Sequence, residues 1–146
     1  MMIKPTNILL KELTDQRILR LTLNDPKRCN ALSEAMLMAL GTALAEAEAN
    51  PAVRVVVLAA QGTAFCAGHD LKEIQARRHD ADAGEACFNA LLGRCSAVMQ
   101  AIVNHSKIII AEVSRRIFVN ILSQNYFFFF FFLFFVNSSN QFSLYI

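Results

Sequence analysis

Apolar and polar residues alternate near the start of the chain and predict a pair of strands. Ile8-Leu9-Leu10 is followed by Arg17 to Leu23, where the alternation largely has a period of two. This is the period of side chains along a strand that is buried on one face. Asn24-Asp25-Pro26 then interrupts the second strand. We therefore expect a hairpin at the start of the fold.

A helix is predicted directly after this break. Ser33 can cap its first turn, and Asn50-Pro51 marks its end. The apolar residues that share one helical face are Leu37, Leu40, Leu44 and Ala47. The pattern therefore predicts a strand, a turn and a helix in succession.

A more continuous apolar run extends from Val53 to Ala60 and indicates a strand covered on both faces. The turn that follows leads into a long helix, whose inner face is marked by apolar residues at spacings of three and four. These residues are Phe88, Leu91, Leu92, Cys95, Val98, Met99 and Ile102. Residues 107–113 have the pattern of a further buried strand. Because helices separate these strands, we expect an α/β fold with a parallel sheet.

Residues 114–146 differ in character from the rest of the chain. They contain no Asp, Glu, Lys, Gly or Pro and include the run Phe127 to Phe132. We therefore divide the chain into a partial domain at 1–113 and an aberrant hydrophobic low-complexity tail at 114–146. The stretch from Tyr126 to Val136 is shorter than the ~20 residues that cross a bilayer, so we do not expect membrane association. Its lack of charge and proline predicts a tendency to aggregate.

Codon degeneracy offers an origin for this tail. Glu112-Val113-Ser114 can be encoded by GAG-GTA-AGT, which has the form of a splice donor, and consecutive phenylalanines can be encoded by a run of thymines. A translated intron and a genuine exon are the two alternatives. The transcript sequence would separate them.

Charge and cysteine content exclude several classes of function. Residues 1–113 carry twelve basic and twelve acidic side chains, so the net charge of +2 comes from Arg115 and Arg116. No basic stripe is present, and no nucleic-acid partner is expected. The four cysteines lack metal-ligand spacing, which predicts reduced thiols and no metal site. The N-terminal residues carry no recognisable leader, which favours the cytoplasm, with the mitochondrion as the alternative if a presequence is missing.

The segment from Ala64 to Glu73 is the most informative for chemistry. A buried strand leads into a turn that contains Gly68, and a helix begins after it. Backbone N–H groups at such a turn can donate to developing negative charge, which stabilises a thioester enolate. This order of elements predicts acyl-CoA chemistry. Asp70 suits a helix cap better than a general base, because an acid beside an enolate would oppose its charge.

Three motifs in this order resemble the N-terminal half of the crotonase superfamily, the enoyl-CoA hydratases and isomerases. The motifs are Leu23 to Ser33, Val53 to Leu58 and Ala64 to Glu73. The form His-Asp-Leu-Lys-Glu in the third motif is similar to the branch called enoyl-CoA hydratase domain-containing protein 3 and to its bacterial relatives. The resemblance covers residues 6–113. It implies the ClpP/crotonase fold, an α/β spiral of β-β-α turns, which would be incomplete here.

The resemblance also implies a site, position by position. The backbone N–H of His69 would be one of two donors to the thioester oxygen, while the imidazole, which we expect to be partly exposed, would have no catalytic role. A side chain at Gly68 would obstruct the approach of backbone and substrate. Relatives line the acyl-CoA pocket at the positions of Phe65, Ala67, Gly68, Asp70 and Leu71, and wrap CoA around those of Lys27, Arg28 and Ala31. Coenzyme A is part of the substrate, and no separate cofactor is implied.

The sequence departs from the family after Val113. Relatives place the second oxyanion donor in a glycine segment there and their catalytic carboxylates later, whereas this chain has Ser114-Arg115-Arg116. The three glutamates Glu73, Glu85 and Glu112 do not match the family's catalytic positions. Losing one donor of such a pair costs ~10²–10³ in rate, so we expect a truncated and catalytically incompetent form. Family members form trimers and hexamers, which we do not expect of this chain.

Three functions therefore remain open. The first is an acyl-CoA enzyme of fatty acid metabolism, a hydratase (a lyase) or an isomerase. The second is a non-catalytic acyl-CoA-binding fragment. The third is a truncated product that has no biochemical role or is tethered to a membrane by its tail. In each case the strand at 108–113 is expected to leave an exposed sheet edge and an apolar face.

Overall fold

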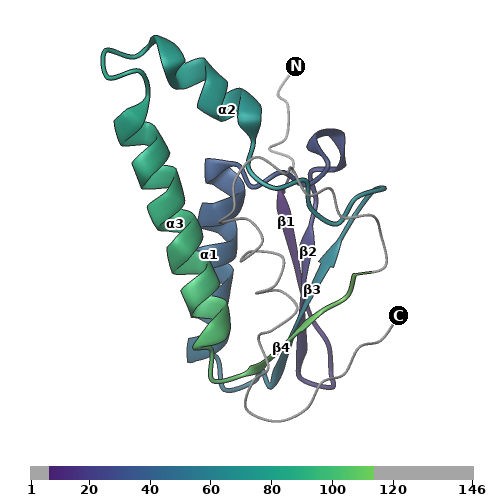
Figure 1. Cartoon of the computed structure of the whole chain (residues 1–146). Helices are drawn as coiled ribbons and strands as arrows, with labels where there is room; N and C mark the ends of the chain where they lie inside the picture. Colours follow the sequence, from purple (N-terminus) through teal and green to yellow (C-terminus); the bar gives the residue numbers. More distant parts are fainter. Residues whose placement is uncertain (1–6, 114–146) are drawn as a thin grey trace, which may run out of the picture.

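Four strands form one mixed sheet in the computed structural model of the chain, which describes residues 7–113. The order is β1 (Leu9–Leu13), β2 (Ile18–Leu23), β3 (Val55–Ala60) and β4 (Ile108–Ala111) (Figure 1). β1 and β2 are antiparallel, whereas β2, β3 and β4 run parallel to one another. The predicted hairpin and the predicted parallel sheet are both confirmed.

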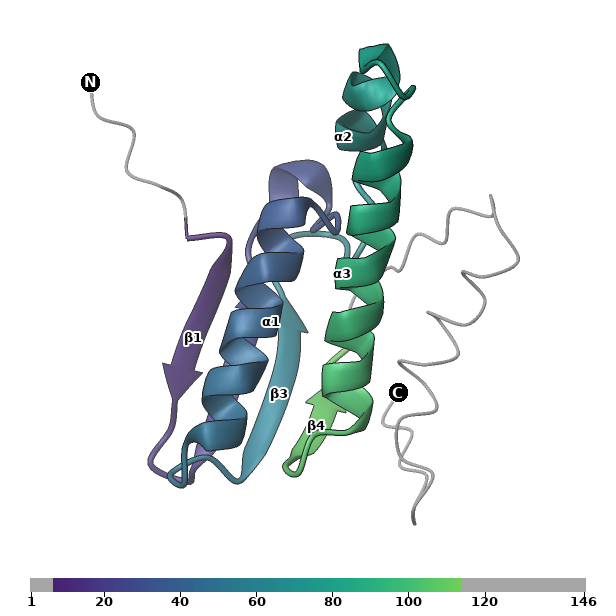
Figure 2. The same cartoon turned by 90° about the vertical axis from the view of Figure 1, so that its left-hand side faces the viewer.

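Two long helices connect the parallel strands and cover the same face of the sheet. α1 (Glu34–Ala49) links β2 to β3, and α3 (Glu85–Val103) belongs to the connection from β3 to β4. Figure 2 shows the two helices side by side in front of the strands. Because parallel strands need such crossovers, the sequence of strands and helices fixes this two-layer arrangement.

The first turn of α1 is capped as the sequence predicts. The Ser33 Oγ accepts a hydrogen bond from the backbone N–H of Met36 at 3.2 Å, and the helix ends before Asn50. Three shorter helical segments flank the loops that follow the strands. These are η1 (Pro26–Arg28), α2 (Leu71–Ala76) and η2 (Arg77–His79).

The core lies between the two long helices and the sheet. Leu21 of β2, Met36 of α1 and Val56 of β3 are all fully buried there. The contribution of α3 comes from Leu91, Cys95, Val98 and Ile102. By length and composition α3 could also cross a membrane, a test that the core helix of a soluble protein passes equally well.

The predicted inner face of α3 is too wide. Phe88 and Leu92 are exposed to 40% and 39%, although both share the helical spacing of the core residues. They lie on the flanks of the apolar face in the first half of α3. A spacing of three and four thus identifies the helix but not the limits of its buried face.

The prediction of a further buried strand over 107–113 is wrong for one face of that strand. Ile108 and Ile110 are 60% and 50% exposed, while Ile109 between them packs against the core. Their partners in register are Val55 and Val57 of β3, which lie on the same face of the sheet. α1 and α3 occupy the opposite face, so the expected exposed apolar face is present in the described part of the chain.

The predictions for 114–146, including the Phe-rich tail and the boundary at 113, lie outside the described residues. They stay predictions. The same holds for the expectation that the β-β-α spiral is incomplete.

Replacing Leu21 by Ala tests the core. We expect a loss of about 3 kcal/mol in the free energy of unfolding, because Leu21 is 0% exposed and the substitution leaves a cavity. Leu13→Ala on the adjacent strand is the matched control, with a loss of less than about 1 kcal/mol, because Leu13 is 46% exposed. Urea unfolding followed by circular dichroism measures both. Equal losses for the two variants would contradict the assigned core.

Candidate functional site

The loops after β2 and β3 meet at one edge of the sheet. Both strands end at this edge because they are parallel, and the N–H of Gln61 donates to the Leu23 carbonyl at 2.8 Å. Further along, the N–H of Leu32 donates to the Gly68 carbonyl at 2.7 Å, within an isolated parallel bridge between Leu32 and His69. The first and third sequence motifs are therefore brought together.

Asn30 ties the two loops to each other from inside. Its side chain is fully buried, and its Nδ2 donates to the carbonyls of Gln61 and Ala64, both at 2.8 Å. Its Oδ1 accepts from the N–H of Asp25, also at 2.8 Å. Both polar atoms of the amide therefore form hydrogen bonds with backbone groups. A carboxylate has no donor and an apolar side chain has neither donor nor acceptor, so neither could make these bonds.

Sequence analysis did not single out Asn30. The residue has a φ of 53°, in the left-handed region that asparagine tolerates better than most residues. An asparagine between the Asp25-Pro26 break and the helix cap Ser33 is the local signal that could have drawn attention to it. The partners of its side chain lie in another loop and leave no local trace.

Gly62 allows the two loops to approach closely. A Cβ at this position would lie 2.6 Å from the Cβ of Pro26, and the φ of Gly62 is +88°. Both the contact and the backbone conformation therefore exclude a side chain here.

Gly68 lies at the centre of the turn and shares with Gly62 a left-handed backbone conformation that strains a side chain. Its φ is +82°, but an added Cβ would meet no protein atom within 4 Å. Its N–H donates to the Sγ of Cys66 at 3.4 Å, and its carbonyl accepts from Leu32. The turn is held on both sides, while the space that a side chain would fill is open.

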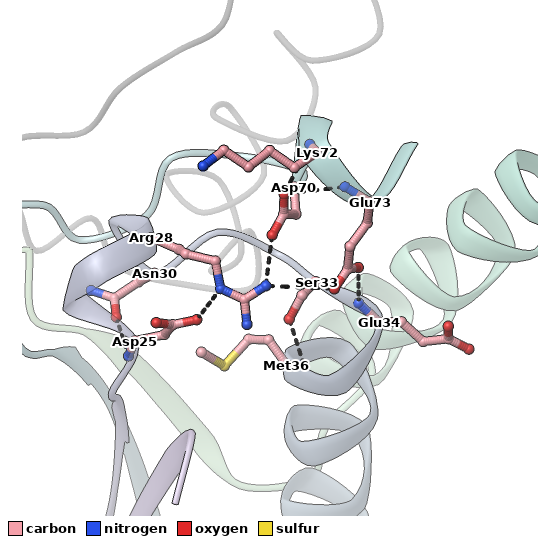
Figure 3. A network of polar contacts seen from close by, with 9 residues as sticks. All are labelled: Asp25, Arg28, Asn30, Ser33, Glu34, Met36, Asp70, Lys72 and Glu73. Carbon is pink, nitrogen blue, oxygen red and sulfur yellow. Dashed lines mark hydrogen bonds and ion pairs between the residues drawn. The ribbon is translucent and has the colours of Figure 1, made fainter. Parts of the chain in front are cut away.

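Asp70 caps the helix that follows the turn, as predicted (Figure 3). Its Oδ1 accepts from the N–H groups of Lys72 and Glu73 at 3.0 and 3.4 Å. Its Oδ2 lies 2.9 Å from Nη1 of Arg28. The carboxylate is buried, so a cap and an ion pair together replace its hydration.

Arg28 also contacts acidic groups on both loops. Its Nε donates to Oδ2 of Asp25 at 2.7 Å, and its Nη1 lies 3.6 Å from Oε1 of Glu73. Glu73 in turn accepts, through Oε2, from the backbone N–H of Glu34 at the start of α1 at 3.0 Å. These polar contacts join η1, α1 and α2 (Figure 3).

The expected partial exposure of His69 is wrong, because its side chain is only 7% exposed. The residue lies under the turn, where the bridge to Leu32 holds its backbone. Burial lowers the pKa of the imidazole, and a hydrogen bond to the Leu32 backbone opposes this in part. Such a ring is neutral near pH 7, which agrees with a role through the backbone only.

The remaining predicted site residues fall into two groups. Ala31 and Phe65 are buried, and the Phe65 side chain packs in the hydrophobic core. Ala67 is partly exposed, whereas Leu71 and Lys27 are exposed. Only the exposed and partly exposed members present side chains that a ligand could touch. Ala31 and Phe65 support the shape of the site from below.

A pocket of about 290 Å³ lies beside α2. Ile74, Phe88 and Leu91 form much of its apolar lining, and an ion pair of 3.0 Å between Arg94 and Glu34 borders it. The partial exposure of Phe88 is explained by this position. Sequence analysis assigned Phe88 to the core and so did not predict the pocket.

Glu112, an acidic residue outside the turn, has a structural partner. Glu112 forms an ion pair of 2.8 Å with Arg20, and the hydrogen bond from Arg20 lowers the pKa of Glu112. Within residues 7–113, no group of three or more His, Cys, Asp or Glu side chains could hold a metal ion. All four cysteines are free, two of them buried and two half-buried.

Comparison with known proteins identifies the family. A family model described as enoyl-CoA hydratase/isomerase matches residues 14–116. The chain belongs to the enoyl-CoA hydratase/isomerase family. The resemblance to the crotonase superfamily seen in the three motifs is thereby confirmed.

Individual relatives agree with this family. Human enoyl-CoA hydratase domain-containing protein 3, mitochondrial, is 38% identical over 98 residues, which cover 66% of this chain and 30% of that protein. The crystal structure of the same human protein superposes with a TM-score of 0.66 at 30% identity and covers 75% of this chain and 41% of that chain. An enoyl-CoA hydratase structure from Mycobacterium smegmatis gives a TM-score of 0.65 at 45% identity. The superposition covers 73% of this chain and 39% of that chain.

These matches show a fold shared with part of each relative. The chain spans between 18% and 31% of the length of the curated relatives that it matches, and the mixed α/β fold is that of crotonase-fold neighbours.

Replacing Asn30 by Asp tests the tie between the loops. We expect a loss of ~3 kcal/mol in the free energy of unfolding, because two buried carbonyls would lose their donor and face a carboxylate oxygen. Asn24→Asp is the matched control, since Asn24 Nδ2 donates to a single carbonyl, that of Asn7, at an exposed position. The free energy of unfolding of Asn24→Asp should fall by less than about 1 kcal/mol. A small loss for Asn30→Asp in urea unfolding would contradict the tie.

The thiol of Cys66 is expected to resist alkylation. Burial raises the pKa of Cys66 to about 11, so hardly any thiolate is present at pH 7.5. Iodoacetamide should modify Cys66 roughly 100-fold more slowly than half-buried Cys87, as measured by peptide mass spectrometry. The two sites should react alike once the chain is unfolded in urea. Equal rates in the folded chain would show that Cys66 is accessible as thiolate.

Proposed function

We propose that this chain binds acyl-CoA thioesters at the turn from Ala67 to Leu71. The observation that carries the proposal is Gly68, which leaves open space in a turn whose backbone is fixed on both sides. A thioester carbonyl can approach such a turn and accept a hydrogen bond there. Family membership supplies the chemical class of the ligand.

The backbone N–H of His69 is the proposed donor to the thioester oxygen. In the enolate, negative charge is shared between the thioester oxygen and C2 of the acyl group. A hydrogen bond to this oxygen stabilises that charge. In a hydratase, water adds across the double bond of a 2-enoyl thioester, with OH bonding to C3 and H to C2. In an isomerase, a proton moves along the acyl chain through the same enolate. The reaction belongs to fatty acid metabolism in either case.

The other ligand contacts are proposed from the family positions. Leu71 and Ala67 border the turn, and the pocket beside α2 offers an apolar surface to the acyl chain. Lys27 is exposed within η1, where it can reach the phosphates of CoA, and Ala31 shapes the surface under the pantetheine. Coenzyme A enters as part of the substrate, and no further cofactor is proposed.

Binding without turnover is the form of this function that we propose for the chain. The family's second oxyanion donor and its catalytic carboxylates have no matching positions in this sequence, which has Ser114-Arg115-Arg116 where the glycine segment is expected. The loss of a donor and of acid-base groups each costs about 10²-fold or more in rate. We place the binder in the cytoplasm, without the trimer or hexamer of its family.

Two ligands that differ in one oxygen test the proposal. Hexanoyl-CoA carries the thioester carbonyl, and S-hexyl-CoA is the thioether without it. We expect calorimetry to show about tenfold tighter binding of the thioester, since one hydrogen bond is worth ~1 kcal/mol or more. Equal affinities, or no binding of either ligand by the folded chain, would refute the proposed site.

Gly68→Ala provides the matching variant. Its methyl group would occupy the open space, so the preference for thioester over thioether should fall to about twofold or less. Gly93→Ala is the control, because a Cβ at Gly93 also meets no atom within 4 Å but lies on α3, away from the turn. With 2-hexenoyl-CoA, we expect no loss of enoyl absorbance above the uncatalysed rate. Rapid hydration would establish a complete enzyme instead of a binder.

A further inference from the structure

Arg28 occupies a position that the family resemblance assigns to CoA, yet its guanidinium is turned toward the protein. Its Nε and Nη1 contact Asp25 and Asp70 at 2.7 and 2.9 Å, and Glu73 lies 3.6 Å away. Figure 3 shows the guanidinium between η1 and the start of α2, with carboxylates on both sides. Lys27 and Arg28 are both exposed, the Arg28 side chain to 43%, but within the described residues only Arg28 of the two forms ion pairs. The two cations therefore differ in their partners.

The Asp70 carboxylate needs a cation more than the other acids in this group. Its side chain is 6% exposed, whereas that of Glu73 is 40% exposed. One carboxylate oxygen caps α2, and the other contacts Arg28. A buried carboxylate that loses its cation keeps the cost of desolvation without the compensating attraction. The start of α2 therefore depends on Arg28.

The same carboxylate lies next to the turn that would meet an anion. Asp70 follows His69 directly, and a negative charge at Asp70 would oppose the negative charge of an enolate oxygen at the turn. Arg28 neutralises that charge from the side of η1. Its position thus serves both the geometry of the turn and its electrostatic potential.

We infer that Arg28 is a positioning residue for the turn from Gly68 to Asp70, and that it acts by holding and neutralising Asp70 instead of by binding a phosphate of CoA. The contact orients Asp70, Asp70 fixes the first turn of α2, and the first turn of α2 fixes the backbone at His69. The part of this inference that concerns the ligand rests on the proposed acyl-CoA function. The part that concerns the turn does not.

Amide hydrogen exchange on the ligand-free chain tests the turn itself. In Arg28→Gln, we expect the N–H groups of Lys72 and Glu73 to exchange at least about tenfold faster, because the cap loses its support. Arg20→Gln is the control, since Arg20 also forms an arginine–carboxylate ion pair, 2.8 Å from Glu112 on the other face of the sheet, but with a carboxylate that is 47% exposed. In Arg20→Gln, hydrogen exchange at the amides of Lys72 and Glu73 should be unchanged. Unchanged exchange in Arg28→Gln would overturn the inference.

Neutralising Asp70 separates charge compensation from a general loss of packing. Asp70→Asn keeps an oxygen that can cap α2 but removes the charge. In the double variant Arg28→Gln/Asp70→Asn, exchange at Lys72 and Glu73 should therefore return to within about threefold of the unmodified chain. A double variant as fast as Arg28→Gln alone would overturn the charge argument. If Arg28→Gln does not fold, Arg28→Lys replaces it. Exchange at the Lys72 and Glu73 amides should then be about threefold faster than in the unmodified chain, because an ammonium cannot contact Asp25 and Asp70 together.

Ligands with and without phosphates decide between the two roles of Arg28. Hexanoyl-CoA and hexanoyl-pantetheine share the thioester, but only the former carries the nucleotide and its phosphates. A positioning role predicts that Arg28→Gln weakens both ligands by the same factor, about tenfold, and that Asp70→Asn restores both. Loss confined to hexanoyl-CoA would overturn the inference in favour of a phosphate contact. If the unmodified chain binds neither thioester, the proposed function fails, while the exchange rates still decide the role of Arg28.

Discussion

The site depends on the hydrogen bonds that hold the loop after β2 against the loop after β3. Parallel pairing brings the two strand ends to one edge, but strands alone do not fix the loops that leave them. The buried amide of Asn30 and the bond from Leu32 to Gly68 provide that constraint. With these contacts in place, Gly68 can hold a left-handed conformation with open space beside it. Without them the turn would be one conformation among many.

Electrostatics adds a second level of organisation to the same junction. A carboxylate at Asp70 gives α2 a sharp start, which a helix of six residues needs because it has little stabilisation of its own. Under the proposed function, the carboxylate can lie beside an anion-accepting turn because a cation lies against it. This junction would then combine two requirements at one place, a helix cap that is negative and a neighbouring backbone that accepts negative charge.

Local signals explain what sequence analysis predicted well. The hairpin follows from alternation, the start of α1 from Ser33, and the cap at Asp70 from its place before a helix. Predictions that require knowledge of distant partners were weaker. The tie made by Asn30, the burial of His69 and the partners of Arg28 all depend on contacts between segments that lie far apart in the sequence. Motif resemblance located the site, but only the packing of the loops showed which of its residues face inward.

The outer face of the sheet has a consequence of a different kind. Ile108 and Ile110 on β4 continue the apolar stripe of Val55 and Val57, and the ion pair between Arg20 and Glu112 lies on the same face. In the described residues, one face of the sheet packs against the helices, and the other exposes apolar side chains that favour contact with any apolar partner that reaches them. Colloidal behaviour of the chain in solution should therefore depend strongly on protein concentration and on kosmotropic salts, which strengthen the burial of apolar surface.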